Sequence, residues 1–276
     1  MTWRPSWWLY VLKIYWPLNH LMAKATGIPF AGKVITFLAK PLFNSKSFNI
    51  SYIPVNANIE PASSTVLTGG IIEELIRLSA HRVIIKRCSC RDAKGSKEYP
   101  IEDSCMLLGF DTRVISPGIA KHVSIDEALE HLKTKMALGL IPMTGRVRMD
   151  DLYYGVPNRG RMLTVCFCCP CCCTVLNSAQ YFPDEFKTGL IKLKGLSIAV
   201  DTEKCKLCGS CIEACFMKTI SLADGKIIHD ESKCIGCGRC SVVCPEKAVH
   251  VLLANPSSAV DEIMDRIKSI VKIECE

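Results

Sequence analysis

The feature that most constrains this chain is a four-cysteine pattern that occurs twice near its C-terminal end. The spacing CxxCxxCxxxC is formed first by Cys205, Cys208, Cys211 and Cys215, and again by Cys234, Cys237, Cys240 and Cys244. A cubane iron–sulfur cluster needs four thiolates around one compact core. A CxxCxxC loop supplies three of them and turns backbone N–H groups toward the sulfurs, so the fourth must come from another segment. Two tandem copies favour iron–sulfur clusters over zinc sites or disulfides.

These motifs resemble the bacterial two-[4Fe-4S] ferredoxins, in which the fourth cysteine of each motif ligates the cluster of the other. Carried over by position, the resemblance implies one cluster held by Cys205, Cys208, Cys211 and Cys244, and a second held by Cys234, Cys237, Cys240 and Cys215. Phe216 stands where the family has a proline. The resemblance is confined to residues 196–254 and implies the pseudo-symmetric ferredoxin fold there.

Local patterns within 196–254 point the same way. Residues 196–200 and 248–252 predict paired strands, and residues 226–229 follow an Asp224-Gly225 turn. The segment carries seven basic and seven acidic residues. A neutral surface is less suited to long-range steering than that of a strongly charged soluble carrier. We therefore expect the redox partner of this domain to be a fixed one, with the chain's own N-terminal domain as the first candidate.

The cysteine content indicates the compartment and the kind of chemistry. The chain has 276 residues, of which 49% are hydrophobic and 18 are cysteines. This composition excludes a disordered chain and a small disulfide scaffold. CxC, CxxC and CC spacings suit thiolate–metal ligation, so we expect a reducing, cytoplasmic environment.

A second group of cysteines lies before the ferredoxin motifs. It comprises Cys88, Cys90, Cys105 and the run Cys166, Cys168, Cys169, Cys171, Cys172 and Cys173, while Cys275 is a separate thiol. Adjacent cysteines point in different directions, so this run cannot all ligate one iron cube. We expect Cys88, Cys90 and Cys105 to join members of the run, first among them Cys166, Cys168 and Cys169, around a further cluster. Arg91 and Lys86 would balance its charge. A zinc site, a redox-active thiol pair and structural cysteines remain alternatives.

Two further resemblances concern this N-terminal group. The CxCCxCCC run resembles the cysteine-rich sites of heterodisulfide-reductase-type proteins, although Pro170 stands where their CCG pattern has glycine. The whole chain resembles prokaryotic 4Fe-4S-binding proteins, largely of anaerobes, that join a CxCR…CxCC-type domain to a C-terminal dicluster ferredoxin. The resemblance implies a redox function.

The remaining patterns predict an α+β protein. Residues 59–190 are expected to form a small cysteine-rich α/β domain, with helices at 71–78 and 125–138 and strands at 51–55, 82–86 and 161–165. Cysteines follow two of these strands, whose ends would converge on one site. Residues 189–195 are expected to be a linker to the ferredoxin domain at 196–254. An amphipathic helix at 257–272 lies within a C-terminal segment, 255–276.

Residues 1–58 are predicted to be a basic, aromatic arm. Before Glu60 the chain has six basic residues and no acidic one, and it holds Trp3, Trp7, Trp8 and Trp16. Lys13 and Asn19 interrupt the apolar runs, so we expect neither a transmembrane span nor a signal peptide. Indole rings favour interfaces, and lysines favour anionic lipid. The arm is therefore predicted to lie on the inner surface of the cell membrane, or to pack on the protein's own core or on a partner subunit.

The main functional prediction is electron transfer, in which two [4Fe-4S] clusters exchange single electrons with a further centre in the N-terminal domain. The enzymatic alternative is a reductase whose N-terminal cysteine site is catalytic and is fed by the ferredoxin domain. A metal- or cluster-handling factor is a third hypothesis. The sequence shows neither a GxGxxG fingerprint nor a P-loop, and no nucleic-acid partner is expected.

Overall fold

The computed structural model describes residues 4–54, 57, 59–60 and 63–274, so Trp3 and Cys275 lie outside the described residues. Its centre is a six-stranded sheet in which all neighbouring strands are antiparallel. In spatial order these strands are β1 (Phe48–Tyr52), β6 (Ile141–Val147), β7 (Leu163–Cys168), β4 (Met106–Leu108), β3 (Arg82–Ile85) and β5 (Ala120–His122). The predicted α+β class is confirmed.

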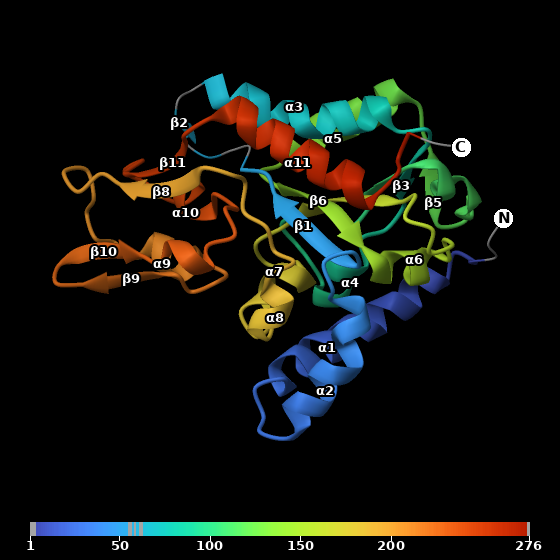
Figure 1. Ribbon diagram of the computed structural model, residues 1–276, viewed down its shortest axis with the longest axis horizontal. Coiled ribbons are helices and arrows are strands. Elements are labelled where there is room, and N and C mark those ends of the chain that lie inside the picture. The colour runs from blue at the N-terminus through green and yellow to red at the C-terminus, as the bar shows by residue number, and fades with distance from the viewer. Residues whose placement is uncertain (1–3, 55–56, 58, 61–62, 275–276) are drawn as a thin grey trace.

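Three helices cover one face of the sheet (Figure 1). They are α3 (Ser63–Leu78), α5 (Ile125–Ala137) and α11 (Pro256–Ile270). The predicted capping box opens α5, since Ser124 accepts from the backbone of Glu127 and the Glu127 side chain accepts from that of Ser124. Helix α11 packs on α3 and buries Ile263 and Ile267, as its amphipathic pattern predicts.

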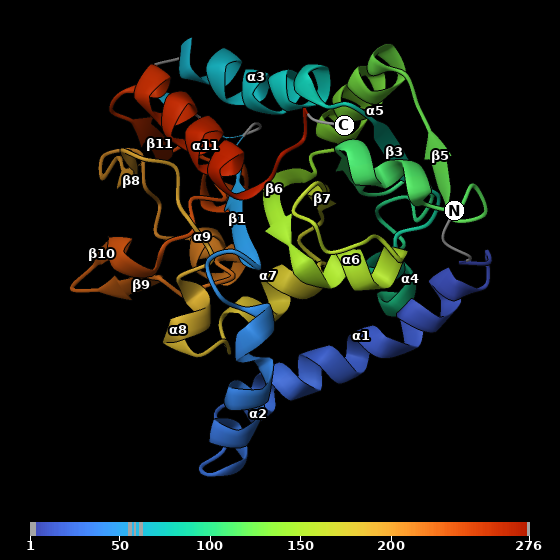
Figure 2. The same cartoon turned by 45° about the vertical axis from the view of Figure 1, so that its right-hand side comes forward.

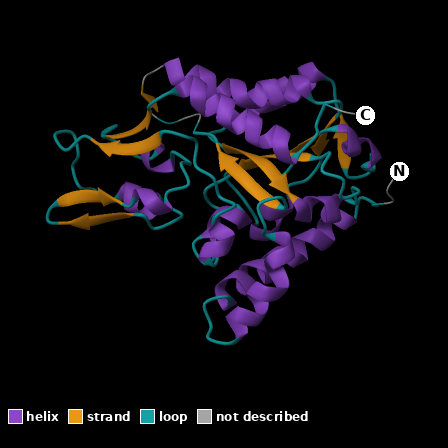
Figure 3. Cartoon of the chain, viewed as in Figure 1, coloured by secondary structure: helices purple, strands orange, loops and turns teal. Residues whose placement is uncertain are grey.

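The opposite face of the sheet is covered by shorter helices and by the N-terminal arm (Figures 2 and 3). The helices on this side are α1 (Trp8–Ala25), α4 (Ser89–Lys94), α6 (Arg148–Tyr154), α7 (Thr174–Ala179) and α8 (Asp184–Lys187). Helix α2 (Ala31–Ala39) forms a hairpin with α1 and is followed by the 3-10 turn η1 (Lys40–Leu42). A second 3-10 turn, η2 (Phe110–Val114), follows β4.

The C-terminal part has the two-fold repeat that its motifs predict. Strand β8 (Leu196–Val200) pairs with β11 (Val249–Leu253), and β9 (Ile220–Ala223) pairs with β10 (Lys226–His229) across the Asp224-Gly225 turn, all antiparallel. Short helices α9 (Ser210–Ala214) and α10 (Arg239–Val242) follow the two CxxCxxC loops, and the 3-10 turn η3 (Glu231–Lys233) precedes the second loop. The predicted strand pairs are confirmed.

Two segments join this part to the rest of the chain. Strand β2 (Ile59–Glu60) adds to the ferredoxin sheet in parallel to β11. Residues 189–191 run beside β1, where Ile50 donates to the Gly189 carbonyl and Ile191 donates to the Ile50 carbonyl, each at 2.8 Å. The predicted linker is therefore pinned to the central sheet by backbone hydrogen bonds.

Strand β7 differs from its prediction in a way that shapes the site. The sequence places a strand at 161–165 with the cysteines beyond its end, whereas β7 continues through Cys168. Side chains alternate between the two faces of a strand. Phe167 therefore packs in the layer under α3 and α5, while Cys166 and Cys168 face the other layer. Cysteine behaves as a small apolar residue, and it can extend a buried strand.

The N-terminal arm is a helical hairpin, and two of its tryptophans face the protein. Trp8 Nε1 donates to the Tyr153 carbonyl at 2.6 Å, and the Trp16 ring packs edge-on against the Tyr153 ring at 5.3 Å. Trp8 and Trp16 therefore follow the alternative in which the arm packs on the protein's own core. Within the described residues, no helix is both long and apolar enough to cross a bilayer.

Helix α6, which supports the site described below, is fixed by a buried ion pair. Arg146 on β6 donates to both carboxylate oxygens of Asp151, to the Met162 carbonyl and to Asn158 Oδ1. Both charged side chains are almost fully buried. The pair therefore ties α6 to the central sheet.

We expect Asp151→Ala to destabilise the protein strongly, because it leaves the Arg146 guanidinium buried without its charge partner. Removing one member of a buried pair costs about 3–5 kcal/mol. The measurement is the urea midpoint followed by circular dichroism under anaerobic conditions. Asp265→Ala, on an exposed position of α11, is the control and should stay within about 0.5 kcal/mol. An unchanged midpoint for Asp151→Ala would contradict this role.

Candidate metal centres

The structure brings the first implied ligand set together. Cys205, Cys208 and Cys211 line one small cavity with Cys244, which arrives from the second motif. The backbone N–H of Ala248 points at Cys244 Sγ at 3.2 Å. Such N–H···S bonds stabilise a metal-bound thiolate and tune its potential.

The second implied ligand set lines a separate cavity. Here Cys234, Cys237 and Cys240 meet Cys215 from the first motif. Burial raises the pKa of the Cys237 thiol to about 12, so an ion must replace the proton before this sulfur becomes a thiolate. Gly238 has a φ of 71°, and a Cβ there would meet Pro54 at 2.8 Å. This glycine lets the ligand loop lie directly against the chain that leaves β1.

The missing proline at Phe216 does not change the turn after the fourth cysteine. Lys218 and Lys247 occupy equivalent positions in the two motifs, with φ of 54° and 50°. Thr219 donates to Cys215 Sγ at 3.3 Å, which matches the bond from Ala248 to Cys244. The Phe216 ring instead packs in the hydrophobic cluster that borders the N-terminal domain.

The sheet topology gathers the N-terminal cysteines at one edge. Strands β3 and β7 are both antiparallel to β4, which lies between them, so both end at the edge where β4 begins. Met106 pairs with Val165, and the next pair outward is Cys105 with Cys166, whose Sγ atoms are 3.0 Å apart. Beyond the end of β3, Cys88 and Cys90 lie at the start of α4. The predicted convergence of the strand ends is observed.

Six thiols line one cavity of about 110 Å³, which we call the thiol pocket. They belong to Cys88, Cys90, Cys105, Cys166, Cys168 and Cys173. Side-chain contacts join Cys88 to Cys90, Cys105 to Cys166, Cys166 to Cys168, and Cys168 to Cys173. A hydrogen bond from Cys90 and the charge of Arg91 lower the pKa of Cys88 to about 6, against the effect of burial.

Arg91 is a buried cation that does not line the thiol pocket but interacts with its Cys88 and Cys166, and with Cys169 of the run. Its guanidinium donates to the carbonyls of Pro100 at 2.8 Å and Phe167 at 2.5 Å. Although burial lowers its pKa, the thiolates of Cys88 and Cys169 raise it further, so the side chain stays charged. Lys86, expected to share this role, instead donates to the Pro117 carbonyl at 2.5 Å. Arg91 alone of the two expected cations lies beside the thiols.

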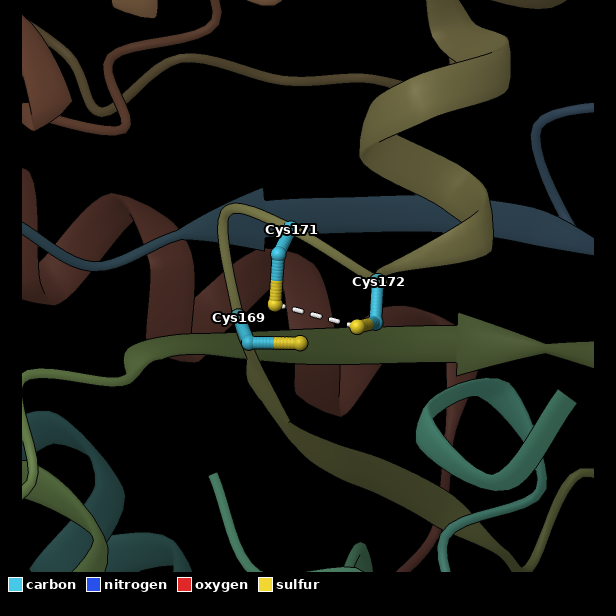
Figure 4. Close-up of side chains that lie close together, drawn as sticks. All are labelled: Cys169, Cys171 and Cys172. Carbon is cyan, nitrogen blue, oxygen red and sulfur yellow. Dashed lines mark hydrogen bonds between the residues drawn. The ribbon is translucent and has the colours of Figure 1, made fainter. Parts of the chain in front are cut away.

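The other cysteines of the 166–173 run form a separate triad (Figure 4). The Sγ atoms of Cys169, Cys171 and Cys172 all lie within 4.8 Å of one another, and those of Cys171 and Cys172 are 3.0 Å apart. Cys171 is exposed, whereas the other two are buried. The three cysteines around Pro170 are thus separated from the other members of the run, which line the thiol pocket.

Thiol spacing distinguishes these two sites. A tetrahedral ion with metal–sulfur bonds of about 2.3 Å holds its thiolates about 3.8 Å apart. Among the described cysteines, the triad is the group of three that meets a limit of 4.8 Å for every pair. No three of the described pocket thiols meet this limit for every pair, although the Sγ atoms of Cys105 and Cys166 are 3.0 Å apart. The triad therefore has the spacing of a site for a single thiophilic ion, whereas the six thiols of the pocket are more donors than one such ion binds.

Two buried residues near the pocket differ from the sequence-based expectation, since Cys173 was not among the first-named ligands of its run and Tyr52 was not a candidate. Cys173 lines the pocket, whereas the predicted ligand Cys169 lies in the triad. Tyr52 on β1 is fully buried, and its hydroxyl has no hydrogen-bond partner among the described atoms. Burial and the charges of Cys168, Cys173, Cys166 and Cys237 raise its pKa. In the sequence, the only signal that could have identified Tyr52 is its position in an apolar stretch that predicts a strand.

Comparison with known proteins identifies the C-terminal repeats. Residues 198–221 and 227–250 match the family model of the 4Fe-4S binding domain, one motif in each stretch. A search of curated proteins returned no match. The two repeats support [4Fe-4S] clusters and iron–sulfur electron transfer.

The crossed ligand sets can be tested against the alternative in which each motif holds its own cluster with all four of its cysteines. We expect Cys208→Ser and Cys244→Ser each to remove the same cluster, so the double variant should lose no more iron than either single variant. Cys208→Ser combined with Cys215→Ser should affect both clusters. Iron and sulfide counts with electron paramagnetic resonance (EPR) of the reduced protein measure this. Additive losses for Cys208→Ser and Cys244→Ser would contradict the crossed assignment.

Proposed function

We propose that this chain is an electron-transfer protein whose ferredoxin region exchanges single electrons with a further iron–sulfur centre in the thiol pocket. When bound, the clusters supply reversible one-electron carriers. The observation that carries the proposal is the contact between the two cysteine sites. Electron transfer slows steeply with distance, so a shared boundary is the first requirement for exchange.

One hydrophobic cluster forms that boundary. Cys168 and Cys173 of the thiol pocket pack in it together with Ile235, and Phe216, Met217 and Cys237 of the ferredoxin region border it. Tyr52 interacts electrostatically with thiols on both sides, since Cys168 and Cys173 belong to the pocket and Cys237 to the second ferredoxin set. The second ferredoxin set is thus the one that faces the N-terminal domain.

The first ferredoxin set lies nearer the surface. Cys208 and Leu207 are exposed, whereas Cys237 and Cys240 are largely enclosed. An external partner would therefore meet the loop of Cys205 to Cys211. This arrangement gives the ferredoxin region one face for a redox partner protein and another for the thiol pocket.

The residues of the thiol pocket fit an iron–sulfur centre. Soft thiolate donors select iron–sulfur clusters, zinc or copper(I), and six thiols around one cavity are more than a single tetrahedral ion can bind. Arg91 offsets the negative charge of the bound thiolates. The unpartnered Tyr52 hydroxyl lies among these thiols, and a metal-bound sulfur would accept its proton in a hydrogen bond.

A reductase is the second candidate, and the shape of the pocket favours it. The pocket holds six thiols, more than the four that a cubane needs, and extends to Asp150, Thr164 and Tyr154. Asp150 accepts from Thr164 Oγ1 at 2.6 Å. Polar groups beside a cluster can position a substrate and move protons. A ligand that perturbs the spectrum of the pocket centre would favour this function.

We expect iron to be lost from Cys166→Ser plus Cys168→Ser, because both thiols line the pocket. The wild-type protein should hold about twelve irons, and this variant about eight, which corresponds to one [4Fe-4S] unit. Cys171→Ser plus Cys172→Ser, from the same run, is the matched control and should keep all of its iron. About eight irons in the wild-type protein, unchanged in the first variant, would overturn the proposed third centre and leave the ferredoxin clusters intact.

Tyr52→Phe tests the boundary between the sites without removing a ligand. Losing a hydrogen bond to a cluster sulfur disfavours the more negative reduced state, so the potential of the pocket centre should become more negative. Iron content should not change. The measurement is an EPR-monitored redox titration, with Tyr99→Phe as the control. A potential unchanged by Tyr52→Phe would show that this hydroxyl does not reach the centre.

A further inference from the structure

The α1–α2 hairpin exposes many large apolar side chains, which together we call the hairpin face. On α1 its members recur at helical spacing, and the connecting loop and α2 extend it. It consists of Trp7, Val11, Ile14, Leu18, Leu21, Ile28, Phe30, Val34, Phe37 and Leu38. Ile14, Phe30 and Phe37 are 77%, 81% and 75% exposed. Patches of this kind mark interaction sites.

The hairpin face is distinct from the surface with which α1 packs on the protein. Leu9 and Leu12 are buried in the cluster under α6, and α1 lies against α4 and α7. His20 contacts Ser178 at 3.1 Å, and Thr26 Oγ1 donates to the Tyr181 carbonyl at 2.8 Å. A helix that is apolar on all sides is normally buried on all sides. Here the protein covers only one side, and α2 stands away from the body (Figure 2).

The backbone at the tip of the hairpin has a specific conformation that depends on Gly32 and Phe30. A Cβ on Gly32 would collide with the Thr26 carbonyl, so this glycine allows α2 to fold closely back on α1. Phe30 has a φ of 67°, a costly backbone conformation for a bulky residue. Such strain persists where the surrounding structure enforces it, and it concentrates at functional sites. The result is that an aromatic ring projects into solvent.

The charged side chains of the hairpin itself are all basic, whereas Asp184 and Glu185 of α8 line a pocket beside Lys33 and Lys40. Residues 1–59 contain no acidic side chain, and Lys24, Lys33 and Lys40 accompany the face. Glu185 of α8 pairs with Lys40 at 3.3 Å, and Asp92 of α4 pairs with Lys13 at 3.1 Å. Lysine stems can lie along an apolar surface while their ammonium groups reach polar headgroups. The combination complements an anionic bilayer.

We propose that the hairpin face binds the surface of an anionic lipid bilayer without crossing it. Leu, Ile and Phe side chains of the hairpin enter the boundary between headgroups and acyl chains, and the lysines contact lipid phosphates. A projecting face with cations and no anions of its own matches this occupant better than a second copy, which would bring like charges together. Trp16 and Asn19 of α1 also line the thiol pocket, so binding orients that pocket relative to the membrane.

The test is flotation of the iron-loaded full chain with two kinds of vesicle. One contains phosphatidylcholine with phosphatidylglycerol, and the other contains phosphatidylcholine alone. We expect binding to the anionic vesicles that weakens with added salt. Phe37→Glu plus Leu38→Glu should reduce it about tenfold or more, since it places charge in the apolar boundary. Lys33→Glu should reduce binding and its salt dependence.

Leu222→Glu plus Ile228→Glu is the matched control, because both residues are exposed on the distant β9–β10 pair. This variant should bind vesicles as the wild-type protein does. Iron content and circular dichroism establish that each variant is folded. Absence of wild-type binding, or equal binding of Phe37→Glu plus Leu38→Glu, would overturn the proposal. Sedimentation could also overturn it. That would be the result if the wild-type protein were a dimer that binds no lipid and Phe37→Glu plus Leu38→Glu converted this dimer to a monomer.

Discussion

Burial of thiol groups that must become anionic ligands is the constraint on which the rest of this structure depends. An unpaired buried anion is costly, so each cysteine group is surrounded by compensating features. In the ferredoxin region these are backbone N–H groups that point at Cys215 and Cys244. Beside the thiol pocket the compensation includes the buried guanidinium of Arg91, held in place by two carbonyls. Backbone N–H groups of Cys90 and Arg91 also bond to Cys88, so the two regions share this kind of compensation and the thiol pocket adds the cation.

The ligand sets also explain how the chain is tied together. Each ferredoxin cavity takes its fourth cysteine from the other motif, so neither half can close alone. The thiol pocket draws on segments at β3, β4 and β7 and at the start of α7, and antiparallel register alone places Cys105 opposite Cys166. Between the two regions, β1 carries Tyr52 and supports residues 189–191. Metal binding and tertiary structure are therefore expected to depend on each other.

Sequence patterns predicted those parts of the protein whose signals are local. The ferredoxin strands, the capped helix α5 and the amphipathic α11 each depend on residues that lie close together in the chain. The division of the 166–173 run was beyond such reasoning, because it depends on β7 continuing to Cys168 and on the turn at Pro170. The packing of Trp8 and Trp16 on the protein depends on Tyr153, which is more than 130 residues away in the chain. Long-range packing thus decided which aromatic residues are exposed and which thiols meet.

The central claim is that a third iron–sulfur centre lies within electron-transfer range of the ferredoxin clusters. The most direct measurement is EPR spectroscopy of the fully reduced, anaerobically purified protein, with pulsed methods to detect dipolar coupling between centres. The account predicts a third paramagnetic species that interacts magnetically with one ferredoxin cluster, the one held by Cys215, Cys234, Cys237 and Cys240. A spectrum explained by two mutually coupled clusters alone, or a third species without coupling to either, would contradict it.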